Sequence, residues 1–98
     1  MALPVELSPH AVLDLEDIAE PIARDDPEAA DRWVVRLANR ARRVGAFPSS
    51  GRMVPEYREP NIREVLVDAD RIIYRLDPAR VLILKCLAGH QRPRLRRR

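Results

Sequence analysis

The chain has few of the residues that stabilise small proteins through covalent bonds or metal ions. It contains one cysteine in 98 residues, Cys86, so no internal disulfide is available. His90 follows Cys86 by four residues, but the other histidine, His10, is distant from both, so the sequence has no Cys/His cluster with the ligand spacing of a zinc site. We therefore expect a protein with no metal ion and no cofactor, and a buried, reduced thiol within the apolar stretch 81–87.

Glycine and long apolar runs are equally scarce. The three glycines are scattered, which excludes a glycine-rich phosphate-binding loop. No stretch approaches the ~18–20 consecutive apolar residues of a membrane span, and the first residues carry no basic segment of a secretion signal. We expect a cytoplasmic protein that does not contact a membrane.

Lysine is almost absent, because 17 of the 18 basic residues are arginine and only Lys85 is lysine. The charges are also unevenly distributed. Residues 1–31 contain nine acids and one base, a net charge of −8, whereas residues 32–98 contain six acids and 17 bases, a net charge of +11. This asymmetry predicts an anionic partner for the C-terminal part of the chain. The preference for arginine over lysine suits phosphate and carboxylate, but genomic base composition can also produce it.

The hydrophobic spacing predicts an α+β fold with the element order β-α-α-β-β-β. Ser8-Pro9 and Asp26-Pro27 are helix starts, in which a side chain caps free amides and proline fits the first turn. We expect Pro21 to kink or end the first helix and Gly45 to end the second. The predicted strands span residues 3–7, 62–67, 71–76 and 80–87, the predicted helices begin at residues 9 and 27, and residues 48–61 form a loop.

These elements predict a helical hairpin packed on a mostly antiparallel sheet. Residues 1–91 form a single domain in this interpretation, and residues 92–98 form a basic tail with five arginines, which we expect to be mobile. At this length, roughly 60–65% of the surface of the unfolded chain can be buried, which is enough for one core.

Alternation along the central strand places basic side chains on one face of the sheet. Arg71 and Arg75 point away from the helices if the apolar set containing Tyr74 faces them, and Arg63 and Lys85 lie on neighbouring strands. One interpretation is a phosphate-binding or partner-binding surface, to which Arg92 after the last strand also belongs. The other is a solvated face whose charge is neutralised by three acids, Glu56, Glu59 and Glu64.

His90 follows the last predicted strand and precedes Gln91-Arg92. A histidine beside arginines can act as general acid or base in RNA cleavage. The alternative is an exposed loop residue without a chemical role.

The order of several short motifs resembles that of the RelE/ParE superfamily of bacterial toxins from type II toxin–antitoxin systems. The motifs are the Ser8-Pro9 helix start with Asp14–Ala19, Asp26–Ala30, Phe47–Arg52, Arg63-Glu64 and Arg71–Arg75. The resemblance implies a growth-arresting toxin that is neutralised by a cognate antitoxin in a toxin–antitoxin hetero-oligomer. We expect an amphipathic, partly acidic antitoxin segment to cover the helical hairpin and to reach the arginine-bearing face of the sheet.

The superfamily divides by target. RelE-like members are ribosome-dependent mRNA endonucleases (mRNA interferases), and this resemblance implies catalytic roles for Glu56, Arg63, Arg71 and His90. ParE-like members are not enzymes and inhibit DNA gyrase. The long helical hairpin and the incomplete nuclease set favour the ParE-like assignment. A third alternative is a non-toxic binding module that retains the fold.

Overall fold

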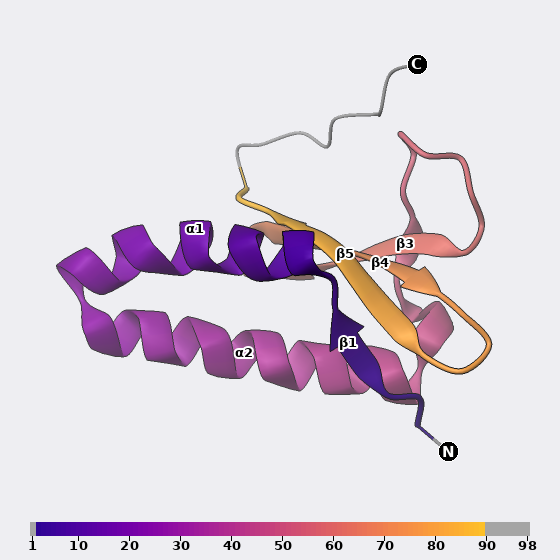
Figure 1. Cartoon of the computed structure of the whole chain (residues 1–98), viewed down its shortest axis with the longest axis horizontal. Coiled ribbons are helices and arrows are strands. Elements are labelled where there is room, and N and C mark those ends of the chain that lie inside the picture. The colour runs from indigo at the N-terminus through magenta and orange to yellow at the C-terminus, as the bar shows by residue number, and fades with distance from the viewer. Residues whose placement is uncertain (1, 90–98) are drawn as a thin grey trace.

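The computed structural model describes residues 2–89, which form a five-stranded sheet with two helices packed against it (Figure 1). The elements are β1 (Val5–Leu7), α1 (Pro9–Asp25), α2 (Pro27–Ala46), the 3-10 turn η1 (Pro48–Ser50), β2 (Arg52–Met53), β3 (Ile62–Val67), β4 (Asp70–Leu76) and β5 (Val81–Leu87). The strand order is β1-β5-β4-β3-β2, with β1 parallel to β5 and the other neighbours antiparallel. The predicted α+β architecture is confirmed. His90, Arg92 and the rest of the 92–98 tail lie outside the described residues.

The sheet contains one strand that the sequence did not predict. Residues 52 and 53 were expected within a loop, but they form β2 at the edge of the sheet, where they pair with Glu64 and Arg63 of β3. Two residues are too few for a recognisable alternation of apolar and polar side chains. The prolines and the glycine around residues 52 and 53 therefore led to the prediction of a loop there.

Both helices begin as expected. The Ser8 hydroxyl accepts a hydrogen bond from the Ala11 amide at 3.0 Å, and the Asp26 carboxylate accepts from the amides of Glu28 and Ala29. These contacts satisfy amides that have no partner within the helix. No helix within residues 2–89 is long and apolar enough to cross a membrane.

The expected ends of the helices differ from the structure in two places. α1 continues past Pro21 to Asp25, because Ile18 and Ile22 on either side of the exposed proline pack against the core and keep the helix in place. Gly45 lies buried inside α2, which ends one residue later. A Cβ atom on Gly45 would lie 2.6 Å from the Leu3 carbonyl oxygen, so this glycine allows the N-terminal segment to approach the helix.

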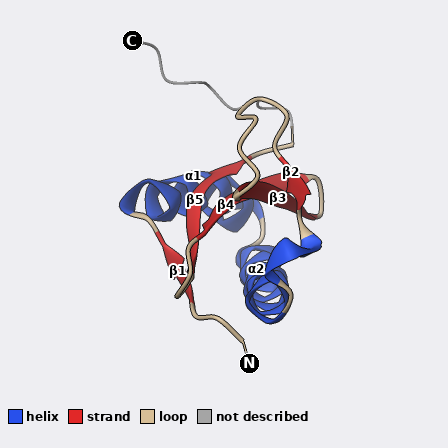
Figure 2. Ribbon diagram, turned by 90° about the vertical axis from the view of Figure 1, so that its right-hand side faces the viewer, coloured by secondary structure: helices blue, strands red, loops and turns tan. Residues whose placement is uncertain are grey.

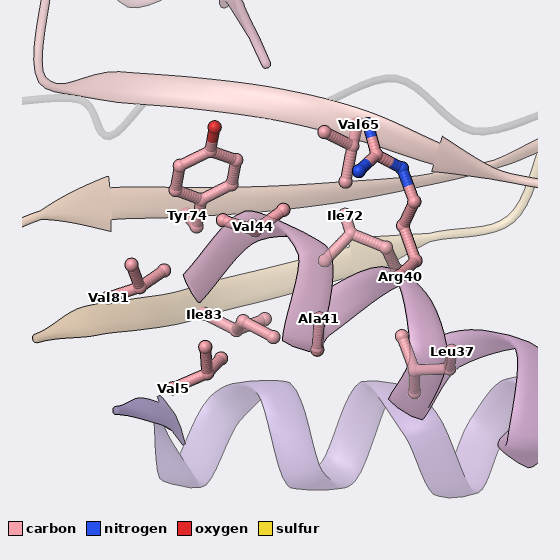
Figure 3. Close-up of a pocket in the computed structure, with 10 residues that line it drawn as sticks. All are labelled: Val5, Leu37, Arg40, Ala41, Val44, Val65, Ile72, Tyr74, Val81 and Ile83. Atoms are coloured by element: carbon pink, nitrogen blue, oxygen red, sulfur yellow. The ribbon is translucent and has the colours of Figure 1, made fainter. Parts of the chain in front are cut away.

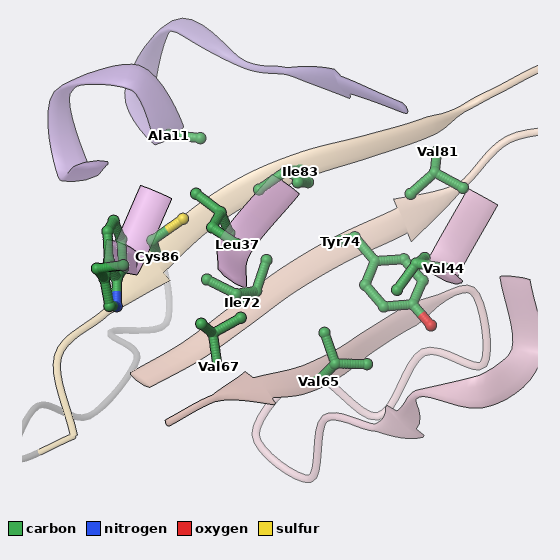
Figure 4. Close-up of a cluster of buried hydrophobic side chains, with 11 residues drawn as sticks. Ala11, Leu37, Val44, Val65, Val67, Ile72, Tyr74, Val81, Ile83 and Cys86 are labelled. Carbon is green, nitrogen blue, oxygen red and sulfur yellow. The ribbon is translucent and has the colours of Figure 1, made fainter. Parts of the chain in front are cut away.

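The main core lies between the helices and one face of the sheet (Figure 4). Its buried members are Ala11, Trp33, Leu37, Val44, Val65, Val67, Ile72, Tyr74, Val81, Ile83 and Cys86. A residual cavity of about 10 Å³ remains between α2 and the sheet, lined by apolar side chains with Arg40 beside them (Figure 3). A space of this size holds at most about one water molecule, so it is a packing defect and not a ligand site.

The opposite face of the sheet is covered by the loop over residues 54–61. Ile73 lies between Ile72 and Tyr74 on β4, so it points away from the helices, and yet it is fully buried. Val54, at the start of the loop, is also fully buried. Figure 2 shows this loop rising above the sheet on the side away from α2. The loop therefore covers part of this face of the sheet.

Candidate functional site

Two arginines and two glutamates come together on the loop-covered face of the sheet. Arg52 lies on β2, Glu56 in the loop 54–61, Glu64 on β3 and Arg71 on β4. Arg71 Nε donates a hydrogen bond to Glu64 Oε1 at 2.6 Å, and Arg71 Nη2 donates to Glu56 Oε1 at 3.3 Å. Arg52 Nε donates to the other carboxylate oxygen of Glu64. We call these four residues the acid–arginine network.

The network is arranged around a buried carboxylate. The side chain of Glu64 is 3% exposed and that of Arg71 is 15% exposed, whereas Arg52 extends into solvent. A buried carboxylate is strongly unfavourable unless it is paired and hydrogen-bonded. Glu64 receives donors on both of its oxygens. The four formal charges sum to zero, so the network carries little net attraction for a distant anion.

The pKa values of the paired groups reflect these contacts. Desolvation alone would raise the pKa of Glu56, but hydrogen bonds from its own backbone amide and from Arg71 lower it below the ordinary value of 4.5. Desolvation likewise opposes the charge on Arg71, yet its hydrogen bonds to Glu64 and Glu56 raise its pKa. Both groups are therefore held in their charged forms.

This geometry limits what Arg71 and Glu56 can do chemically. A phosphate that approaches Arg71 must compete with two carboxylates that already accept hydrogen bonds from it. Glu56 is a weak base because its pKa is lowered and its carboxylate is engaged by Arg71. Of the two interpretations of this face, the structure favours neutralisation by Glu56 and Glu64, although the ion pairs are partly buried and not solvated.

Arg63 does not lie with Arg71, and the expectation that the two share a face is wrong. It stands opposite Tyr74 in the β3–β4 ladder, and Tyr74 belongs to the core beneath the helices. Side chains directly opposite each other in a ladder point to the same face. Val65 and Val67 face the helices, so alternation along β3 also places Arg63 on that side.

Arg63 and Tyr74 together fix the turn after α2. Arg63 Nη1 donates to the Gly51 carbonyl oxygen at 2.9 Å. The Tyr74 hydroxyl donates to the Pro48 carbonyl oxygen at 2.8 Å and accepts from the Gly51 amide at 3.0 Å. Burial raises the pKa of Tyr74, so its hydroxyl stays protonated as this donation requires. Arg63 therefore takes part in holding the turn after α2.

Arg75 and Lys85, the other predicted phosphate-binding residues within the described part of the chain, also have partners. Arg75 Nε donates to Asp77 at 3.1 Å, and Asp77 also accepts from Arg80. The Lys85 ammonium lies 5.8 Å from the centre of the Tyr57 ring, within the range of a cation–π interaction. No group of three or more His, Cys, Asp or Glu residues within 2–89 is arranged to hold a metal ion.

Sequence reasoning gave Glu64 only a neutralising role and gave Arg52 none. In β3, Glu64 follows Arg63 and shares its face with the exposed Leu66, so the strand carried no local signal that this carboxylate would be buried. Arg52 carried no signal either, because its contact with Glu64 depends on the unexpected pairing of β2 with β3.

A second feature is an apolar groove of about 670 Å³ on the other side of the molecule. It is formed by β1, α1 and α2 and is lined by Ala2, Leu3, Pro4, Val5, Leu7, Leu15, Val34, Leu37, Ala38, Ala41, Arg42 and Ile83. Leu7 and Val34 are 43% and 49% exposed, and Arg42 is the only charged side chain of the lining. A groove of this composition suits the apolar face of a peptide segment.

Comparison with known proteins gave a match to a family model and matches to solved structures. The family model described as "ParE toxin of type II toxin-antitoxin system, parDE" matches residues 5–93. A solved chain from the "Chromosomal ParDE TA system from P. aeruginosa" superposes with a TM-score of 0.72 and 17% sequence identity, covering 89% of this chain and 96% of that chain. Among curated proteins no match was found. At this identity the structural match establishes similarity of fold alone.

Proposed function

This chain belongs to the ParE toxin family of type II toxin–antitoxin systems, and from this we propose that it arrests growth by inhibiting DNA gyrase and is neutralised by a cognate antitoxin. The state of Arg71 is the observation that favours gyrase over RNA as the target. The nuclease alternative needs this arginine free to bind phosphate, but its guanidinium is engaged by Glu64 and Glu56. Arg63, the second arginine of that alternative, lies on the opposite face.

The groove between β1, α1 and α2 is the surface that we assign to the antitoxin. Its apolar lining matches the apolar side of an amphipathic segment, and Arg42 at the groove favours an acidic residue on that segment. Such a complex is a toxin–antitoxin hetero-oligomer. This assignment revises the prediction that the antitoxin reaches the arginines of the sheet, because Arg71 and Arg75 already have carboxylate partners.

The nuclease alternative retains one favourable observation. Glu56 and Arg71, a general base and a phosphate-binding residue in that alternative, are 3.3 Å apart in the structure. A variant that alters only the base separates the two functions. Glu56→Gln preserves the size of the side chain and an oxygen that can accept from Arg71, but it removes the basic carboxylate.

The test is to induce the chain without an antitoxin and to pulse-label DNA and protein synthesis over the following minutes. We expect DNA synthesis to fall first, and Glu56→Gln to retain growth arrest. An earlier collapse of protein synthesis that Glu56→Gln abolishes would instead establish the RNA-cleaving alternative. Absence of growth arrest from a soluble, folded chain would leave the non-toxic binding module.

A further inference from the structure

We propose that the loop 54–61, together with Leu66 of β3, forms the surface with which this toxin contacts a protein target. The partner surface that it fits carries a carboxylate and an apolar contact, and it is protein rather than nucleic acid. The inference rests on the toxin function proposed above and names the part of the molecule that carries it out. It uses the side of the sheet away from α2, where the loop rises above the strands (Figure 2).

The loop is held in one conformation by its own backbone. The amides of Tyr57 and Arg58 both donate to the Val54 carbonyl oxygen, at 3.1 and 3.3 Å, and the Ile62 amide donates to the Glu59 carbonyl oxygen at 3.0 Å. Val54 is fully buried at one end of the loop. A surface that is ordered before binding loses less conformational entropy when a partner docks.

Side-chain contacts fix the loop to the sheet as well. Glu56 binds Arg71, which is itself held by the buried Glu64, and Tyr57 lies beside the Lys85 ammonium. Ion pairs that remove charge from water stabilise a fold poorly compared with apolar contacts, and their best-supported role is to specify one geometry. The acid–arginine network therefore fits a role in positioning the loop.

Arg58 is the residue that most directly suggests recognition. Its φ angle is 55°, in the left-handed region where glycine is the unstrained residue. The chain instead places an exposed arginine there, within a loop that is otherwise well bonded. Backbone strain at an exposed, well-ordered residue is typical of functional sites. We infer that the Arg58 side chain is required for contact with a partner and not for folding.

The charges around Arg58 argue for a protein partner. On this face Arg52, Arg71 and Arg75 all have carboxylate partners, whereas within residues 2–89 Arg58 takes part in no ion pair. A surface for nucleic acid needs several cations free to replace counterions. Protein interfaces instead combine a few arginines with apolar anchors.

Leu66 supplies the apolar part. It stands opposite Arg71 in the β3–β4 ladder, so it points to the same face of the sheet as the acid–arginine network. Its side chain is 59% exposed, although its neighbours Val65 and Val67 are buried. The surface thus offers one unpaired arginine and one exposed leucine on a rigid support.

The experiment compares four purified variants with the natural chain in a plasmid supercoiling assay with purified DNA gyrase. We expect Arg58→Glu and Leu66→Ser to raise the half-inhibitory concentration by about 10-fold or more, as for central interface residues. Arg58→Lys keeps the positive charge and should stay within about 3-fold of the natural chain. Arg24→Glu alters an exposed arginine of α1 away from this surface, and we expect no change.

Growth arrest after induction and thermal unfolding are measured for the same variants. Unchanged melting temperatures with weakened gyrase inhibition support the proposed surface. If the natural chain inhibits gyrase and the loop variants inhibit it equally well, this inference is wrong while the proposed function stands. If the natural chain arrests growth without inhibiting gyrase, the proposed target is wrong. The surface proposal is then decided by whether Arg58→Glu and Leu66→Ser abolish growth arrest.

Discussion

Glu64 offers the most direct test of the acid–arginine network. We consider Glu64→Gln, which keeps the size of the side chain and removes its charge. In the natural chain both oxygens of this buried carboxylate accept hydrogen bonds from arginines. In the variant, Arg71 retains only Glu56 as a charged partner, at 3.3 Å, and the glutamine amide nitrogen cannot accept a bond from either arginine.

The expected destabilisation follows from the burial of each partner. Removing one member of a buried ion pair typically costs about 3–5 kcal/mol, because the other charge stays buried without compensation. Here the loss is smaller because Arg71 keeps Glu56, and the side chain of Arg52 is 70% exposed and can be solvated. We therefore expect Glu64→Gln to lower the free energy of unfolding by about 2–4 kcal/mol. This is a large part of the roughly 5–15 kcal/mol that stabilises a typical domain.

Urea unfolding followed by tryptophan fluorescence measures this effect. Trp33 is the only tryptophan, and it is buried against the sheet, where its indole nitrogen donates to Asp70 at 2.9 Å. Arg24→Ala is the matched control because it breaks an ion pair with Glu20 in which both side chains are exposed, and it should change stability by less than about 0.5 kcal/mol. A change of that small size for Glu64→Gln would refute the conclusion that the network holds the loop.

Two further predictions concern titratable groups. Because the pKa of Glu56 is lowered on folding, its contribution to stability is fully present above the ordinary value of 4.5 and is lost as pH falls through the lowered pKa. The urea midpoints of the natural chain and Glu56→Gln should therefore converge as pH is lowered from 7 to about 3, and a constant gap would contradict this linkage. Burial, with smaller effects from Asp14 and Asp70, raises the pKa of Cys86 to about 12, so a thiol-reactive chromophore at pH 8 should label the chain only after unfolding. Rapid labelling of the folded protein would show that the thiol is accessible.

The helices and the three long strands could be predicted from the sequence because each carries a local signal. Ser8 and Asp26 precede prolines at the helix starts, and the apolar spacing changes from helical to alternating after residue 61. Of the two effects predicted for Pro21, a kink or an end, the helix end is wrong, because packing of Ile18 and Ile22 on either side outweighs the local cost of a proline. The role of Gly45 depends on the approach of Leu3, which is distant in sequence and therefore left no local pattern.

The candidate site was only partly predictable for the same reason. Alternation of side chains along β4 correctly places Arg71 and Arg75 on the face opposite Tyr74, which faces the helices. Applied to β3, the same rule places Arg63 on the face opposite Arg71. The apolar residues Val65 and Val67 were the available signal for that separation. Which acid pairs with which arginine depends on the path of the loop 54–61 and on the register of β2, and neither has a periodic pattern to read.

In the folded chain, the uneven distribution of charge along the sequence does not correspond to an equally uneven distribution of unpaired charge. Most arginines of the sheet are paired with acids of the same part of the chain, so the net charge of residues 32–98 overstates the free positive charge of the sheet. Within residues 2–89, the basic side chains of α2 that take part in no ion pair are Arg40, Arg42 and Arg43. They lie in the C-terminal half of α2, and Arg42 lines the apolar groove. Electrostatic attraction of an acidic antitoxin segment should therefore act at the groove, leaving the opposite face of the sheet for the target.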